Sequence, residues 1–227
     1  MTWTAPPERV LLDIEMPKPQ PFVLDPAKTA VVIVDMENFF VHNPRFPRSF
    51  DTVEGNARLI AKAREAGAPV IYIQSVRKPT ALEVVRFGGE PMLAEGSEGV
   101  EIVPELAPLP GEAVAQKWSH DPWAWPDLDA VLVEKGIVPE DWTVLVTGVS
   151  AAVCAHATAL GFSNRHFMTI IPMDATAAGS VEEEARVYAQ YAGPGYTHNM
   201  AFTLSDLVTF EFGAIPAEQQ MASLATA

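Results

Sequence analysis

The chain has 227 residues and a formal net charge of −14, with 48% hydrophobic and 19% charged residues. This composition is typical of a folded globular domain and unlike a disordered chain, and the acidic balance argues against nucleic acid or an anionic membrane as a partner. The single cysteine cannot form an internal disulfide, which favours a reducing compartment, the cytoplasm. We find neither a signal-peptide pattern nor an apolar run near the ~20 residues of a membrane span.

A proline-rich segment opens the chain. Because proline fixes φ and lacks a backbone donor, residues 1–27 are predicted to be an extended arm, wrapped on the domain or on a partner subunit. Its prolines are Pro6, Pro7, Pro17, Pro19, Pro21 and Pro26. We expect the main domain over 28–212 and a C-terminal tail over 213–227.

The first strand is predicted over 29–34, a continuous apolar run typical of a strand that is buried on both faces. It ends at Asp35, and an acid at the carboxyl end of a parallel strand is a candidate for chemistry, although a loop residue or helix cap is the common alternative. Apolar residues at helical spacing over 52–66, closed by Gly67, predict an amphipathic helix. A second strand is predicted over 69–74.

Residues 75–111 lack periodicity, and so long a loop is predicted to be functional or partly structured, as a lid or an interface segment. A short strand over 112–116 then ends at Lys117, again a charge at a strand end. Residues 118–125 form a loop rich in aromatic side chains. Pro126 is expected at the first position of the next helix.

The stretch 143–162 predicts a strand, a tight turn and a helix. An apolar strand reaches Thr147, Gly148 breaks it, and Ser150 is the predicted N-cap. Cys154 then lies in the first helical turn, where the helix dipole and the free N–H groups favour a thiolate and an oxyanion. A lone cysteine among alanines is equally consistent with a small buried hydrophobe.

A further strand is predicted over 166–171 and a helix from Ser180, whose first-turn glutamates are expected to be solvated. Alternating strands and helices predict an α/β fold, a single domain of three layers with a mostly parallel central sheet. Right-handed crossovers would bring Asp35, Lys117 and the turn before Cys154 to one side of that sheet.

A carboxylate, an ammonium and a thiol at one sheet edge can form a nucleophilic site. Lys117 is expected to lower the pKa of the Cys154 thiol and to keep Asp35 ionised. Asp35 can then take the thiol proton and later deliver it to a leaving amine. Spacing alone does not establish this site.

Three motifs in order carry a family resemblance: TAVVIVDMENFF with Asp35, AVAQKWS with Lys117, and VTGVSAAVCAHATALGF with Cys154. The later IIPMDATAA, with Asp174, fits the same pattern. Over about residues 28–210 the chain resembles the isochorismatase-like cysteine hydrolase superfamily. The most similar branch contains amidohydrolases of N-carbamoylsarcosine, ureidoacrylate and biuret, to which nicotinamidases are related.

The resemblance implies a Rossmann-like three-layer fold and a catalytic triad of Asp35, Lys117 and Cys154. Such a triad cleaves the C–N bond of a small carboxamide, N-carbamoyl or ureido compound through a thioester, releasing ammonia or an amine. The resemblance also implies a cis peptide bond between Val149 and Ser150. The N–H groups of Ser150 and Cys154 would form the oxyanion hole.

Glu37 departs from the pattern, since the family often has Gln there. If Glu37 and Asp35 share a face, repulsion between the two carboxylates raises one of their pKa values. The metal site of nicotinamidases needs several histidines after the second strand, and residues 75–80 contain none. We therefore expect no metal and no cofactor.

Substrate contacts are predicted from the loops around the triad: Glu37, Phe39, Phe40, Arg45, Trp118, His120 and Trp123. The tryptophans fit loop or interface packing equally well. Arg45, Arg48, Arg77 and Arg86 are candidates to pair a substrate carboxylate. The expected partners are a small-molecule amide and further copies of the chain, as a homodimer or homotetramer. Two alternatives stay open, a vinyl-ether hydrolase that uses Asp35 without a covalent step, and a catalytically silent binding protein.

Overall fold

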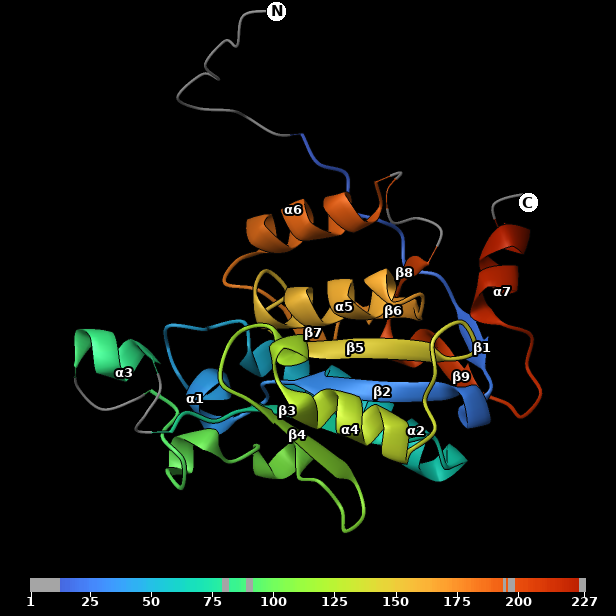
Figure 1. Ribbon diagram of the computed structural model, residues 1–227. Coiled ribbons are helices and arrows are strands. Elements are labelled where there is room, and N and C mark those ends of the chain that lie inside the picture. Colours follow the sequence, from blue (N-terminus) through green and yellow to red (C-terminus); the bar gives the residue numbers. More distant parts are fainter. Residues whose placement is uncertain (1–12, 79–81, 89–91, 194, 196–198, 225–227) are drawn as a thin grey trace, which may run out of the picture.

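Figure 1 shows the computed structural model, which describes residues 13–78, 82–88, 92–193, 195 and 199–224. The strands are β1 (Phe22–Leu24), β2 (Thr29–Val34), β3 (Val70–Ser75), β4 (Ala113–Lys117), β5 (Thr143–Val149), β6 (Met168–Pro172), β7 (Thr176–Ala177), β8 (Met200–Thr203) and β9 (Val208–Phe210). The α-helices are α1 (Asn38–Val41), α2 (Val53–Ala66), α3 (Leu82–Phe87), α4 (Pro126–Glu134), α5 (Cys154–Asn164), α6 (Val181–Tyr191) and α7 (Ala217–Leu224). None of these helices is both long and apolar enough to cross a membrane.

The central sheet has seven strands in the order β4-β3-β2-β5-β6-β8, with β7 paired to β5. Each described pairing in it is parallel. The central strands β2 and β5 are buried along their whole length, as expected for strands covered on both faces. The predicted single α/β domain with a mostly parallel sheet is thus confirmed.

Alternate residues of β2 pack into two different cores, because successive side chains of a strand point to opposite faces. Val32 and Val34 belong to a core shared with α4, α5 and α6. Val31 and Ile33 belong to a second core shared with α2 and with β1. Helices therefore cover both faces of the sheet, which gives three layers (Figure 1).

The described part of the predicted arm lies on the domain. Its strand β1 pairs in parallel with β9 near the C-terminal end of the chain. The Gln20 N–H donates to Phe202 O at 2.8 Å, and the Gln220 side chain bonds both backbone groups of Val23. Residues 1–12 of the arm lie outside the described residues, and the boundaries at 27 and 212 stay predictions.

Two local predictions are wrong. The strand β5 does not break at Gly148 but continues to Val149, because Gly148 passes β2 closely at φ +91°, where a Cβ would lie 2.0 Å from Val34 O. Among the first-turn glutamates of α6, Glu184 is buried rather than solvated. It accepts hydrogen bonds from Arg48 Nε and from the Ala178 N–H.

Candidate active site

Polar side chains gather where four neighbouring elements meet at one edge of the sheet. Asp35 follows β2, Ser75 ends β3 and Lys117 ends β4, while Cys154 begins α5 directly after β5 and its turn. Ser75 and Lys117 are register partners in the β3–β4 pair. Because parallel strands end at the same edge, the sheet brings residues together that are far apart in sequence.

A buried ion pair forms the base of this cluster. Lys117 Nζ lies 2.8 Å from Asp35 Oδ2, and each of the two side chains is only 1% exposed. Burial alone would lower the pKa of Lys117, but the acidic groups around it, Asp35 first and then Cys154 and Glu37, together outweigh burial and the pKa is raised. Lys117 is therefore an ammonium at neutral pH.

Ser75 connects the two charges. Its hydroxyl accepts a hydrogen bond from Lys117 Nζ at 2.6 Å and donates one to Asp35 Oδ1 at 3.0 Å. Sequence analysis missed this residue, because it placed the end of the strand at Gln74. The available signal was that Ser75 is a polar residue at a strand end, like Asp35 and Lys117.

Glu37 lies fully buried beside the ion pair. Its Oε1 accepts the Ser75 N–H at 2.5 Å, and its Oε2 has no hydrogen-bond partner among the described residues. Burial, and then the negative charge of Asp35, raises the pKa of Glu37 well above the usual value for a glutamate. Repulsion between the two carboxyls thus acts as expected, but burial is the larger cause of the raised pKa of Glu37.

The turn before Cys154 differs from the predicted helix start. The N-cap of α5 is Val153, since the carbonyl of Ser150 is occupied by the N–H groups of Val153 and Ala155 in a turn. The Val149–Ser150 peptide bond is cis, as the family resemblance implies. Cys154 is the first residue of α5.

The thiol of Cys154 is protonated at rest. Burial, and then the charge of Asp35, raises its pKa, whereas Lys117 acts in the opposite direction. The predicted lowering by Lys117 and the helix dipole is therefore outweighed, because a thiolate loses hydration in this position. The site consequently needs a base to activate the sulfur.

A cavity of about 240 Å³ opens above the thiol. Ser150 and Cys154, the predicted oxyanion donors, both line it. Its other lining residues are Phe39, Phe40, Arg45, Phe46, Ser49, Ser75, Arg77, Met92, Leu93, His120, Val149, Val153, Ala177, Ala178 and Gly179. The wall is mostly apolar with a few polar groups, the usual character of a small-molecule site.

The predicted substrate contacts divide into two groups. Phe39, Phe40, Arg45 and His120 line the cavity, and His120 Nδ1 lies 3.3 Å from Cys154 Sγ. Glu37, described above, lies beneath the cavity and is not among its lining residues. The two tryptophans lie elsewhere.

Trp118 and Trp123 pack within their loop and against α5. The ring of Trp118 packs against that of Trp125 in a tilted arrangement, with 4.5 Å between ring centroids. Trp123 contacts Phe162 edge to face at 4.8 Å and lies under the guanidinium of Arg165. Neither indole is among the described residues that line the cavity, so the structure favours the packing alternative for both.

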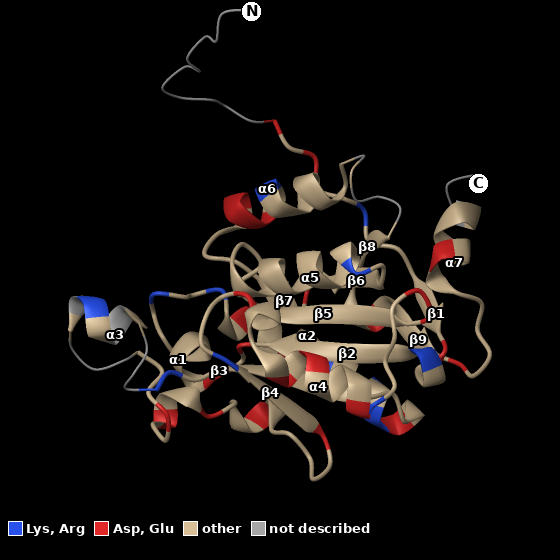
Figure 2. Ribbon diagram, viewed as in Figure 1, with Lys and Arg blue, Asp and Glu red and all other residues tan. Residues whose placement is uncertain are grey.

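Only two of the four candidate arginines line the cavity. Arg45 and Arg77 line the cavity. Arg48 is bound to Glu184 at 2.7 Å, and Arg86 is an exposed residue of α3. In this acidic protein, Figure 2 shows Lys and Arg positions, coloured blue on the ribbon, in the loops around α1 and α3, at the end of the sheet where the cavity lies.

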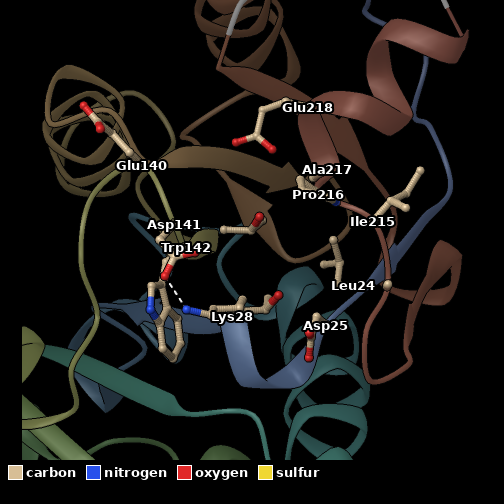
Figure 3. Close-up of a pocket in the computed structure, with 13 residues that line it drawn as sticks. Leu24, Asp25, Lys28, Glu140, Asp141, Trp142, Ile215, Pro216, Ala217 and Glu218 are labelled. Atoms are coloured by element: carbon tan, nitrogen blue, oxygen red, sulfur yellow. Dashed lines mark hydrogen bonds and ion pairs between the residues drawn. The ribbon is translucent and has the colours of Figure 1, made fainter.

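Figure 3 shows the lining of a second cavity, of about 120 Å³. It lies at the end of the sheet where the strands begin, opposite the end that carries the first cavity. It is lined by Thr29 and Thr143, the first residues of β2 and β5, and by an ion pair between Lys28 and Asp141. It contains neither a thiol nor a histidine. Across the described part of the chain, no group of three or more His, Cys, Asp or Glu residues is placed to hold a metal ion.

Comparison with known proteins agrees with this architecture. Residues 29–201 match the profile of the isochorismatase domain. The ureidoacrylate amidohydrolase RutB of Methylobacterium radiotolerans is 28% identical over 220 residues, covering 85% of this chain and 78% of that protein.

Solved structures give the same result. N-carbamoylsarcosine amidase from Thermoplasma acidophilum superposes with a TM-score of 0.65 and 28% identity, covering 82% of this chain and 99% of that one. A cysteine hydrolase from Pseudomonas syringae pv. phaseolicola gives a TM-score of 0.68 at 22% identity, covering 92% and 99%; at that identity the likeness concerns the fold. Since the domain profile spans most of the chain, the protein belongs to the isochorismatase family.

Proposed function

We propose that the protein is a cysteine-dependent amidohydrolase, which cleaves the C–N bond of a small carboxamide, N-carbamoyl or ureido compound through a thioester. The observation that carries the proposal is the buried Asp35–Lys117 ion pair beside the Cys154 thiol, at the base of a cavity. A nucleophile, a base and a cation in one place are the groups that amide cleavage by a covalent route needs.

In the first half of the proposed reaction, Cys154 Sγ attacks the substrate carbonyl while Asp35 takes the thiol proton. The N–H groups of Ser150 and Cys154 hold the oxyanion that forms. The proton then passes to the leaving nitrogen, the C–N bond breaks, and a thioester remains. Lys117 Nζ donates a hydrogen bond to Asp35 Oδ2 and so holds this carboxyl group in place to receive the thiol proton.

The proposed substrate is a small acid that carries a carbamoyl or ureido group. Relatives are named for ureidoacrylate and N-carbamoylsarcosine, and the cavity volume of about 240 Å³ suits molecules of this size. Arg45 and Arg77 in the wall can pair a carboxylate, and Phe39 and Phe40 can cover a flat carbon skeleton.

The test is ammonia release from a panel of aryl carboxamides, aliphatic amides, N-carbamoyl acids, ureido acids and biuret, with Cys154→Ala as the control. We expect release from a carbamoyl or ureido acid, its loss in the variant, and weaker activity on the neutral amide analogue. Ammonia release that survives in Cys154→Ala would contradict the cysteine mechanism. No release from any member of the panel would support the vinyl-ether hydrolase or the binding protein.

A further inference from the structure

The cavity gives a substrate direct contact with only part of the polar cluster. Asp35 and Lys117 are almost fully buried and are not among the described residues that line the cavity. Its ionisable lining residues are Arg45, Arg77, His120 and Cys154. Among the side chains that line the cavity, His120 is the ionisable group that can be neutral at neutral pH and so act as a base toward water there.

His120 lies against the reacting atom. Its Nδ1 is 3.3 Å from Cys154 Sγ, while the residue as a whole is exposed, so the imidazole contacts sulfur on one side and solvent on the other. A water molecule that attacks a thioester carbon bonded to Sγ would be within hydrogen-bond reach of this ring.

The loop that carries His120 is fixed on both sides. Trp125 Nε1 donates to Ser119 Oγ at 3.0 Å, and the carboxylate of Asp121 accepts the Trp123 N–H at 3.0 Å. The ring of Trp118 packs against that of Trp125 across the same loop. These contacts hold the imidazole beside the sulfur in the free protein.

The charged groups that face His120 are Lys117, Arg77 and Asp35, together with the thiol of Cys154. Partial burial, followed by the positive charges of Lys117 and Arg77, lowers the pKa of His120, and Asp35 opposes this. The imidazole is thus neutral at neutral pH and free to accept a proton.

We propose that His120 is the catalytic base of the second half-reaction, the hydrolysis of the thioester on Cys154. His120 takes a proton from the attacking water as the oxygen–carbon bond forms. The carbon–sulfur bond then breaks, and the imidazolium returns that proton to the departing sulfur. This assignment rests on the proposed function, and it gives the two proton transfers to two bases, Asp35 below the thiol and His120 inside the cavity.

The experiment compares His120→Asn with the wild-type protein in rapid-mixing measurements of ammonia release. In the variant we expect a burst of one leaving group per subunit, ammonia from a primary carboxamide or the amine from a carbamoyl compound, followed by turnover slowed about 10²- to 10⁴-fold, the usual contribution of a general base. Intact-mass spectra should show the acyl group retained on the variant and absent from the Cys154→Ala/His120→Asn double variant. Asp35→Asn, which blocks the first half-reaction, should give no burst.

The matched control is His42→Asn, because His42 is an exposed histidine that does not line the cavity. It should behave like the wild-type protein. The pH dependence of turnover distinguishes a base from a residue that only packs. Turnover of the wild-type protein should fall in acid with a pKa below the usual ~6.5 of histidine, because protonated His120 cannot accept a proton. That decline should be missing from the slow turnover of His120→Asn.

Wild-type turnover in His120→Asn, or slow turnover without a burst and without an acyl adduct, would overturn the assignment. If His120→Asn does not fold, hydrolysis of p-nitrophenyl acetate by the wild-type protein still tests the assignment. The slow release of p-nitrophenolate that follows the burst reports thioester hydrolysis, and its rate should decline in acid. Absence of that decline would likewise overturn it. Failure of the proposed function is distinct, since the wild-type protein would then release no ammonia at all.

Discussion

Replacing Ser75 by Ala removes one hydroxyl that serves both members of the buried ion pair. The hydroxyl bonds Lys117 Nζ at 2.6 Å and Asp35 Oδ1 at 3.0 Å. Hydrogen bonds to charged groups contribute about 1.5–3 kcal/mol each. Because Lys117 and Asp35 keep their direct bond, we take the lower end of the sum, a loss of about 3 kcal/mol. For a domain of this size that corresponds to a melting temperature lower by about 6–12 °C.

The assay is thermal unfolding followed by circular dichroism, with Ser97→Ala as the matched control. Ser97 precedes a 3₁₀ helix at Glu98–Val100 and its side chain makes no capping hydrogen bond, so its loss should change stability by no more than about 0.5 kcal/mol. A melting temperature for Ser75→Ala equal to that of the control would refute the view that Ser75 holds the ion pair.

Three further predictions concern the buried acid, the catalytic helix and assembly. Above about pH 4.3 the unfolded chain loses a proton from Glu37 that the folded protein keeps, so the wild-type protein loses stability with rising pH up to the raised pKa. The melting temperature of Glu37→Gln, compared with that of the wild type, should therefore rise as the pH increases above about 4.3, and a constant difference would contradict this. In Gly161→Ala, the new Cβ would lie 1.7 Å from Trp123 Nε1, so we expect a loss of about 1–3 kcal/mol and altered tryptophan fluorescence; unchanged spectra and stability would show that the ring moves freely. Light scattering should give the mass of a dimer or tetramer, and a monomer mass would disprove that prediction.

The sequence predicted the position of a strand well where a continuous apolar run forms a strand that is buried on both faces. The run before Asp35 has no polar residue between Ala30 and Val34, and it forms β2 as predicted. Asp35 follows this run, Lys117 ends the strand β4, and parallel topology therefore allowed both residues to be placed on one side of the sheet. These predictions depend only on local pattern and on parallel topology.

Other features depend on contacts that no local pattern records. The cavity wall combines Phe46, Leu93, His120 and Ala178, which come from loops far apart in sequence. Trp123 packs against Phe162 instead of lining the cavity, and only the tertiary structure shows this contact. The direction of the shift in the pKa of Cys154 could not be predicted from the sequence either, because it depends on how deeply the sulfur is buried.

The pairing of β1 with β9 has a consequence for how the folded protein comes apart. Val23 and the Gln220 side chain that bonds it are 197 positions apart, so this contact closes nearly the whole chain into a loop and must form late in folding. Both strands are only three residues long, which makes their separation among the least costly openings. That opening would expose Phe22 and Leu24, now buried, while the cavity stays intact. We expect aggregation to begin from the paired ends of the chain, under conditions in which the enzyme site is still folded.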